Sequence, residues 1–242
     1  MSLFTPLLWI LLIAPLIVIA CFKTEKINWK YLVFFILYFL ADVFLQASGK
    51  QLIDLDLKFN WSGKILSLIL GLIIIFSVSK EERIKIGFTS KTNSPASLKF
   101  GLLVFFGFTF FDIIFKLILF PKGNAFDLET FLFQATMPGL TEEILFRGIS
   151  LWLLDKAFAP TWNYRGIKFG WAFVIVTVLF GVSHGAVLDQ DLHLKFDIIT
   201  MVYLTLISSL SVGILRQFSG NLIYSILGHN TINLINAVIR IL

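Results

Sequence analysis

Acidic and basic side chains occur together inside one apolar stretch of the 242-residue chain, TMPGLTEEILFRG. It contains Glu142, Glu143 and Arg147. Glu143 precedes Arg147 by four residues, the better orientation for an ion pair along one helix face. Glu142 points about 100° away from Glu143 on an ideal helix. In an apolar environment Glu142 therefore needs a partner on another helix, or a proton, and is a candidate functional group.

Two later apolar stretches carry histidine and amide side chains. VLFGVSHGAV places Phe180 and His184 on one helix face, and its small residues would let another helix approach closely. LGHNTINLINAVIR contains a polar stripe at positions i, i+4, i+7 and i+11: His229, Asn233, Asn236 and Arg240. Each group alone could serve helix packing. Together, two carboxylates, two histidines and an asparagine are the ingredients of a hydrolytic site.

The composition indicates that these residues lie within a membrane. Apolar residues make up 57% of the chain and charged residues 14%, with a mean hydropathy of +0.88. This composition excludes a soluble domain, a disordered chain and a disulfide framework. The net charge of +5 would suggest nucleic acid in a soluble protein, but here the basic residues lie between apolar runs and set orientation. The sequence thus predicts an all-α, multi-pass transmembrane bundle that binds no nucleic acid.

Charged, proline and glycine clusters divide the chain into eight candidate membrane segments. They are residues 3–22, 31–49, 61–79, 99–120, 127–155, 168–188, 197–215 and 221–242. The stretch from Lys80 to Lys99 is expected to form an amphipathic surface segment followed by a loop. Twelve lysines and arginines fall in loops on that side and six on the other, so that side is predicted to be cytoplasmic. The residues before Cys21 fit a transmembrane helix better than a lipoprotein signal.

Several other polar residues have simpler explanations. Asp112 and Lys116 are four residues apart and can neutralise each other. Asp42 has no partner in its own segment; its role is open, and a hydrogen bond to a neighbouring helix is one explanation. His193 is expected to be a solvated loop residue rather than part of a metal site with Asp189 and Asp191.

The three runs containing Glu142-Glu143-x-x-x-Arg147, Phe180-x-x-x-His184 and His229-x-x-x-Asn233 resemble, in order, the motifs of the CPBP family. These are intramembrane proteases related to the type II CAAX prenyl endopeptidase (Ras-converting enzyme), also called ABI-domain proteins. Each motif alone is weak, and all three in order are specific. The resemblance covers about residues 97–242 and marks them as a catalytic core that follows N-terminal transmembrane helices over residues 1–96.

The resemblance implies a helical bundle with a catalytic cavity inside and hydrolysis of a peptide bond. Glu142 would activate water with the help of His184. His229 and Asn233 would stabilise the oxyanion. Glu143 and Arg147 would be a supporting pair, with Phe180 in the same motif as His184. The substrate would be a membrane-associated protein or peptide, and the small chain is expected in a bacterial plasma membrane.

Three matters stay open at the level of sequence. No cofactor is expected because the His-Glu-x-x-His spacing is lacking, although His184, His229 and Glu142 could still hold zinc. A small transporter would also place charged residues in mid-membrane, and a non-catalytic immunity or interaction protein of the same family would share the motifs. Finally, the predicted segments place His184 and His229 at different depths, so their meeting requires tilted, broken or displaced helices.

Overall fold

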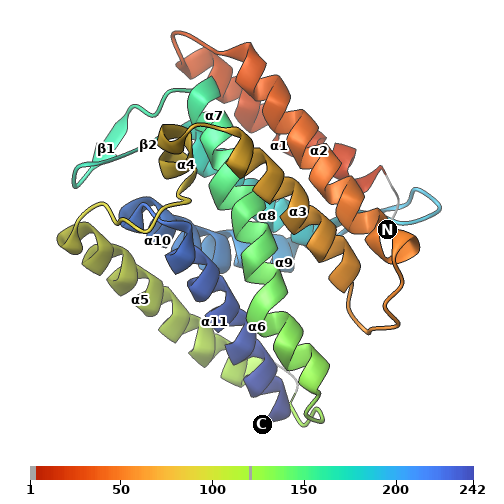
Figure 1. The fold of residues 1–242 in the computed structure, drawn as a ribbon. Coiled ribbons are helices and arrows are strands. Elements are labelled where there is room, and N and C mark those ends of the chain that lie inside the picture. The colour runs from red at the N-terminus through yellow and green to blue at the C-terminus, as the bar shows by residue number, and fades with distance from the viewer. Residues whose placement is uncertain (1–3, 120–121) are drawn as a thin grey trace.

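Helices dominate the computed structural model, which describes residues 4–119 and 122–242 (Figure 1). The helices are α1 (Thr5–Lys23), α2 (Trp29–Leu52), α3 (Trp61–Ser77), α4 (Lys80–Ile86), α5 (Pro95–Leu119), α6 (Leu128–Glu142), α7 (Leu151–Ala157), α8 (Trp171–Gly185), α9 (Ile198–Tyr203), α10 (Leu210–Ser219) and α11 (Leu222–Ile241). Two π-helical segments join some of them into longer rods: η1 (Glu143–Ser150) links α6 to α7, and η2 (Leu204–Ser209) links α9 to α10. The predicted all-α membrane bundle is confirmed.

Within residues 4–119 and 122–242, five helical rods are long and apolar enough to cross a membrane: α1, α2, α5, α9–α10 and α11. The apolar helices α3 and α8 are shorter. At 1.5 Å per residue, the 15 residues of α8 extend about 22 Å, less than the roughly 30 Å of a hydrocarbon core. Every predicted segment contains a helix, while the count of eight crossings remains a prediction. The predicted surface segment after Lys80 is α4, followed by a loop.

Two short β-hairpins lie within regions predicted as helix or loop. β1 (Trp162–Tyr164) pairs with β2 (Ile167–Phe169), and β3 (Ala186–Leu188) pairs with β4 (Leu194–Phe196), both antiparallel. The first hairpin turns at Arg165 and Gly166, which both have positive φ, as a two-residue type I′ turn requires. The helical segment predicted over 168–188 was therefore too long at both ends, because its first residues belong to β2 and its last residues belong to β3.

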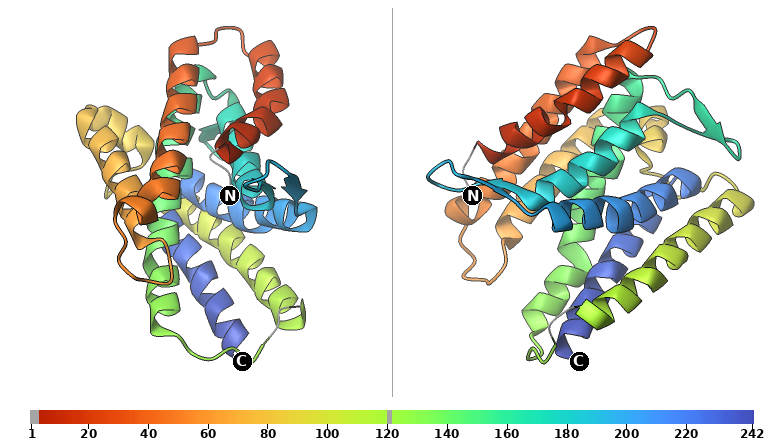
Figure 2. Two further views of the ribbon diagram at one scale, coloured as in Figure 1. Left: turned by 90° about the vertical axis from the view of Figure 1, so that its right-hand side faces the viewer. Right: turned by 180° about the vertical axis from the view of Figure 1, so that it is seen from behind.

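The rod formed by α6, η1 and α7 runs through the centre of the bundle (Figure 1). Figures 1 and 2 show α1, α2 and α3 on one side of this rod and α5 and α11 on the other. α8 packs against α1 and against the α9–η2 rod. The buried core contains many aromatic rings around the central rod, including Phe35, Phe39, Phe146 and Phe180. The helices before and after residue 96, the predicted boundary between the N-terminal helices and the catalytic core, thus share one hydrophobic core.

A side chain of α11 forms hydrogen bonds with the backbone of α6 on either side of Pro138. Pro138 lies inside α6 and cannot donate a backbone hydrogen bond. The Asn230 side chain accepts a hydrogen bond from Gly139 N (2.8 Å) and donates one to Thr136 O (3.3 Å). Asn230 is buried, so its amide satisfies backbone groups that water cannot reach. This bond fixes α11 against α6 immediately beside His229.

The isolated charged residues noted in the sequence have structural partners. Asp42 of α2 accepts hydrogen bonds from Ser67 of α3 and from Gln46 on its own helix. Its open role is therefore that of a link between helices. Asp112 forms the expected ion pair with Lys116 and also accepts a hydrogen bond from Tyr203 of α9.

Candidate active site

Glu142 is the meeting point of three helices besides its own. Its Oε1 lies 2.8 Å from Nζ of Lys64 on α3. Its Oε2 lies 3.7 Å from Nε2 of His184 on α8 and 3.9 Å from Nε2 of His229 on α11. Oε2 is buried and has no hydrogen-bond partner among the residues that the structure describes. One oxygen of the carboxylate is thus held by a cation, and the other faces two imidazole nitrogens.

The hydrogen bonds of the two histidines determine which nitrogen carries a proton. His184 Nδ1 lies 2.7 Å from the carbonyl oxygen of Phe180, which can only accept, so Nδ1 is the donor. His229 Nδ1 lies 2.8 Å from Oε1 of Glu143, a carboxylate that also pairs with Arg147, so Nδ1 is again the donor. In the neutral form of each histidine, Nε2 is therefore an unprotonated acceptor facing Glu142.

Glu143 and Arg147 form the predicted ion pair, with 3.0 Å between Arg147 Nη1 and Glu143 Oε1. Arg147 also donates a hydrogen bond to Ser209 Oγ (2.8 Å) on η2, and its guanidinium lies 4.2 Å from the centre of the Phe180 ring. The Phe180 ring in turn lies 4.5 Å from the His184 ring. The pair is almost completely buried, so each charge is neutralised by its partner and not by water.

Short helices and a π-helix bring these residues together. η1 begins at Glu143, so the two adjacent glutamates lie where α-helical geometry gives way to a wider π-helix. Glu143 reaches Nδ1 of His229 while Glu142 faces Nε2 of the same ring. His184 lies on the last turn of α8, whose 15 residues are fewer than a membrane crossing needs. The predicted mismatch in depth does not keep the two histidines apart, because Nε2 of each ring lies within 3.9 Å of Glu142 Oε2.

The glycines flanking His184 allow the predicted close approach of another helix. A Cβ atom at Gly181 would collide with Thr205 on η2, and one at Gly185 would collide with Met201 on α9. The α9–η2 rod therefore packs directly against the face of α8 that carries His184.

Two cavities meet at Glu142 and His184. The first, of about 400 Å³, is also lined by Arg147, Phe180, His229 and Asn233. The second, of about 260 Å³, lies towards α1, α2 and α3 and is lined by Lys64 and Gln46. All seven predicted site residues are thus brought together, at the buried centre of the bundle. Asn233 lies one turn after His229 and faces the first cavity, as do Asn236 and Arg240 of the predicted stripe.

Two residues of the site were missed in the sequence. Lys64 falls inside the predicted segment 61–79 but was used only in the count of basic residues that sets orientation; it lies in α3 with only 14% of its side chain exposed. A single lysine in an otherwise apolar helix was the signal that could have identified it. Asn230 adjoins His229 but lies off the polar stripe. Pro138 was the feature of the sequence that could have identified Asn230, because a proline inside a helix leaves backbone groups that a neighbouring polar side chain must satisfy.

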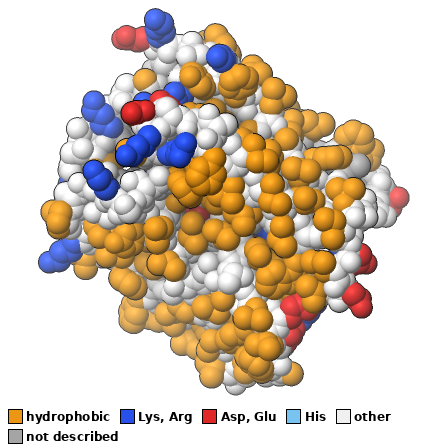
Figure 3. All heavy atoms as spheres, in the orientation of Figure 1, with side chains coloured by type: hydrophobic (Ala, Val, Ile, Leu, Met, Phe, Trp, Pro, Cys, Tyr) orange, Lys and Arg blue, Asp and Glu red, His pale blue; other side chains and the backbone are white. Residues whose placement is uncertain are grey.

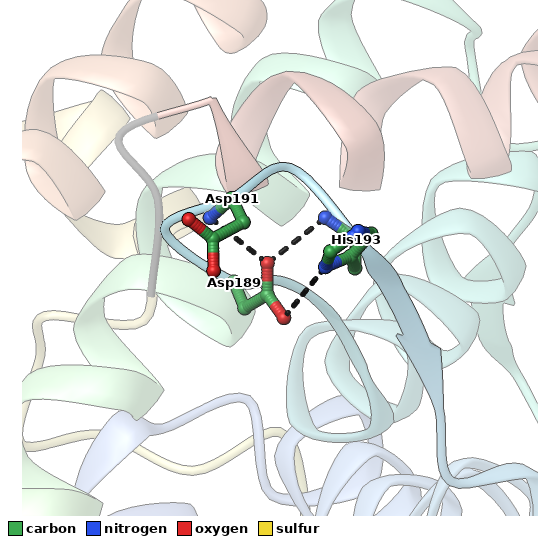
Figure 4. Close-up of side chains that lie close together, drawn as sticks. All are labelled: Asp189, Asp191 and His193. Carbon is green, nitrogen blue, oxygen red and sulfur yellow. Dashed lines mark hydrogen bonds and ion pairs between the residues drawn. The ribbon is translucent and has the colours of Figure 1, made fainter.

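The residues around His193 form a separate cluster near the β3–β4 hairpin (Figure 4). The ligand atoms of Asp189, Asp191 and His193 lie within 4.8 Å of one another. Asp189 Oδ1 accepts hydrogen bonds from the backbone N–H groups of Asp191 and His193, and Lys195 Nζ lies 3.2 Å from Oδ2. His193 is exposed, as predicted, and turn formation accounts for this arrangement.

Residues 123–235 match the family model described as Type II CAAX prenyl endopeptidase Rce1-like. This segment contains both glutamates, Arg147, both histidines and Asn233. Residues 123–235 form an Rce1-like domain. The predicted family resemblance is confirmed, over a shorter range than 97–242. No curated protein and no solved structure matches the chain.

The Rce1-like domain supports a protease at the level of the family, in an integral membrane protein. The matched range ends before Asn236 and Arg240 and begins after α5. Lys64 therefore lies outside the Rce1-like domain, yet it contacts the first glutamate of its motif. The N-terminal helices thus contribute a charged side chain to the candidate site.

Proposed function

We propose that the chain is an intramembrane endopeptidase that hydrolyses a peptide bond of a membrane-associated protein or peptide, in a bacterial plasma membrane. The observation that carries this proposal is the convergence of Glu142 Oε2 with Nε2 of His184 and Nε2 of His229 at a buried polar cavity. A carboxylate and an imidazole that both accept hydrogen bonds can hold one water molecule between them.

Water activation follows from the two acceptors. The distance of 3.7 Å between Glu142 Oε2 and His184 Nε2 is too long for a direct hydrogen bond but suits a bridging water. Such a water would donate one hydrogen to each acceptor and direct an oxygen lone pair into the cavity. Glu142 would accept the proton as the water oxygen attacks the peptide carbonyl. The C–N bond then breaks, and Glu142 passes the proton to the leaving nitrogen, giving a carboxylic acid and an amine.

The charge on the attacked carbonyl oxygen needs hydrogen-bond donors. Asn233 has a side-chain amide on the cavity wall and can donate directly. His229 can donate from Nε2 only as an imidazolium, because Nδ1 is already committed to Glu143. The hydrogen bond between the Glu143 carboxylate and the His229 imidazole therefore gives Glu143 a defined role, which is to support His229.

The same three side chains could act as ligands for zinc, with Phe180 O and Glu143 as supporting hydrogen-bond acceptors. The position of Lys64 favours the metal-free mechanism, because its ammonium group lies 2.8 Å from Glu142 and would repel a divalent cation. We expect cleavage to survive strong chelation. Complete inhibition by a chelator, reversed by added zinc, would contradict the metal-free mechanism.

Comparative proteomics of membranes tests the proposed function. Cells expressing wild type are compared with cells expressing Glu142→Gln at the same level, and C-terminal fragments present only with wild type identify substrates. Glu25→Gln, in the exposed loop between α1 and α2, is the matched control. We expect such fragments with wild type and with the control. Identical fragments in all three strains would contradict an endopeptidase that depends on Glu142.

A further inference from the structure

A third cavity, which is polar, lies at the end of the bundle formed by α4, the β1–β2 hairpin and the last turn of α10. It has a volume of about 600 Å³, and its lining includes Lys85, Lys91, Lys168 and Arg216. None of the described residues that line it is acidic. We refer to it as the cationic groove. It is separate from the candidate active site, since the two share no lining residue.

The walls of the cationic groove are fixed by hydrogen bonds. Asn93 donates to the backbone oxygens of Gln217 and Phe218, and Asn221 donates to Thr89 O at 2.6 Å. These bonds attach the loop after α4 to α10 and α11. Across the groove, Arg165 holds the β1–β2 hairpin against α5 by stacking on Phe100, with 4.4 Å between guanidinium and ring centre. The groove is therefore a built feature rather than a gap between mobile loops.

Donor groups in the groove are left without partners. Arg216 is 5% exposed; its Nη2 donates to Lys85 O, but its Nε is buried without a hydrogen-bond partner among the described residues. Gln217 Nε2 is also buried and unpartnered there. Buried donors without acceptors cost free energy, and the buried carboxyl of Asp155 interacts with the charge of Arg216. The exposed ammonium groups of Lys91 and Lys168 are the donors that a ligand in the groove would reach. Lys91 and Lys168 form no ion pair with another described residue, whereas Lys85 pairs with Glu82.

The surroundings of the groove indicate a membrane surface. Figure 3 shows Lys and Arg side chains gathered over α4 and β1–β2, beside a broad hydrophobic face. Phe88, Trp162 and Tyr164 are exposed near the groove. Aromatic side chains at the border between charged and apolar surface are typical of the headgroup level of a bilayer. This end is also the one predicted to be cytoplasmic, where anionic phospholipids attract basic residues.

We propose that the cationic groove binds the phosphate group of an anionic phospholipid at the membrane surface. Guanidinium, ammonium, hydroxyl and amide donors in one concave site fit phosphate oxygens. The exposed aromatic residues at its border favour a lipid over free phosphate, because they would contact the glycerol and upper acyl region. This site is independent of the proposed peptidase, since it involves none of the active-site residues.

Lipid retention measured by native mass spectrometry tests the proposal. Purified full-length protein in uncharged detergent is titrated with phosphatidylglycerol, with phosphatidylcholine of the same acyl chains as a comparison. The groove variant is Lys91→Gln/Lys168→Gln. The matched control is Lys23→Gln/Lys26→Gln, which removes the same charge from exposed positions around the end of α1. Both variants avoid the buried Arg216, so that folding is not at risk.

We expect wild type and control to bind phosphatidylglycerol equally and more tightly than phosphatidylcholine, and the groove variant to bind about 30-fold more weakly. Equal binding by all three proteins would overturn the proposal, as would equal weakening in both variants. Inorganic phosphate is the second arm. If it protects wild type against thermal unfolding while phosphatidylglycerol does not bind, a soluble phosphate is the ligand and the lipid assignment is wrong. None of these measurements depends on peptide hydrolysis.

Discussion

Lys64 fixes one oxygen of Glu142 and leaves the other facing the cavity. Without that cation, Glu142 would lose its direct ion pair in a buried site where removing one partner of a pair is costly. Lys64 is thus a positioning residue for the proposed base, supplied by α3 rather than by the Rce1-like domain. This arrangement makes the N-terminal helices part of the proposed chemistry.

Replacing Lys64 by glutamine should reduce cleavage about 100-fold or more, the usual contribution of a well-placed general base. Lys64→Arg keeps the charge and should restore part of the rate, which a purely structural defect would not explain. Lys50→Gln, an exposed lysine on α2, is the control. The rate is measured with reconstituted protein. A Lys64→Gln variant that cleaves at the wild-type rate would show that Lys64 has no such role.

The two asparagines near His229 should separate stability from activity. Asn230→Ala leaves Gly139 N–H and Thr136 C=O without their side-chain partner and should lower the free energy of unfolding by about 1–3 kcal/mol for each unsatisfied group. Asn233→Ala should leave stability near that of wild type but reduce kcat by about 10²–10³ as a lost oxyanion donor. Thermal unfolding and cleavage rates are measured on both. A stable Asn230→Ala variant, or a fully active Asn233→Ala variant, would contradict these assignments.

At the scale of elements, α4 is attached to α7 through Glu82. Its carboxylate lies 2.9 Å from Lys156 Nζ and accepts a hydrogen bond from Trp152 Nε1 at 2.5 Å. Partial burial raises the pKa of Glu82, but the hydrogen bonds from Lys156, Lys85 and Trp152 outweigh it and lower the pKa to about 2. Glu82 is therefore charged at neutral pH.

Because the pKa of Glu82 is lower in the folded state than the ordinary value of 4.5, its contribution to stability is present above about pH 4.5 and is lost as pH falls towards 2. Glu82→Gln should cost about 1–2 kcal/mol at pH 7 and at pH 5.5 alike. The difference from wild type should shrink below pH 4. Denaturant unfolding in detergent at several pH values measures this. A difference that grows on acidification would contradict the assigned sign.

At the scale of the whole molecule, hydrophobicity predicted the helices because lipid requires every backbone group to be satisfied within a helix. Residue spacing along a helix also predicted local pairs such as Glu143–Arg147, because residues four apart lie on the same helix face. Neither hydrophobicity nor spacing could predict the Lys64–Glu142 ion pair, which joins residues far apart in the chain, or the π-helix that begins at Glu143. The β1–β2 hairpin was missed because its strands are too short to show alternation, although its Arg165-Gly166 turn is a recognisable signal.

The orientation of the bundle is predicted from its basic loops and can be measured directly. In a Cys21→Ser background, a cysteine at Ser94 is expected to react with an impermeant reagent only after the cells are opened. A cysteine at Leu55, in the exposed loop between α2 and α3, should react in intact cells. The reverse pattern would invert the predicted topology and place the cationic groove on the outer surface.

The central claim is that Glu142 activates the water that hydrolyses the substrate. The most direct test is the cleavage rate of a substrate by purified, reconstituted Glu142→Gln, with Glu25→Gln as the matched control and thermal unfolding as a check on folding. Glutamine keeps the size of the side chain but cannot accept the proton from water. We expect no detectable cleavage by a folded Glu142→Gln variant and a wild-type rate for the control. Cleavage by Glu142→Gln at a rate close to that of wild type would contradict this claim.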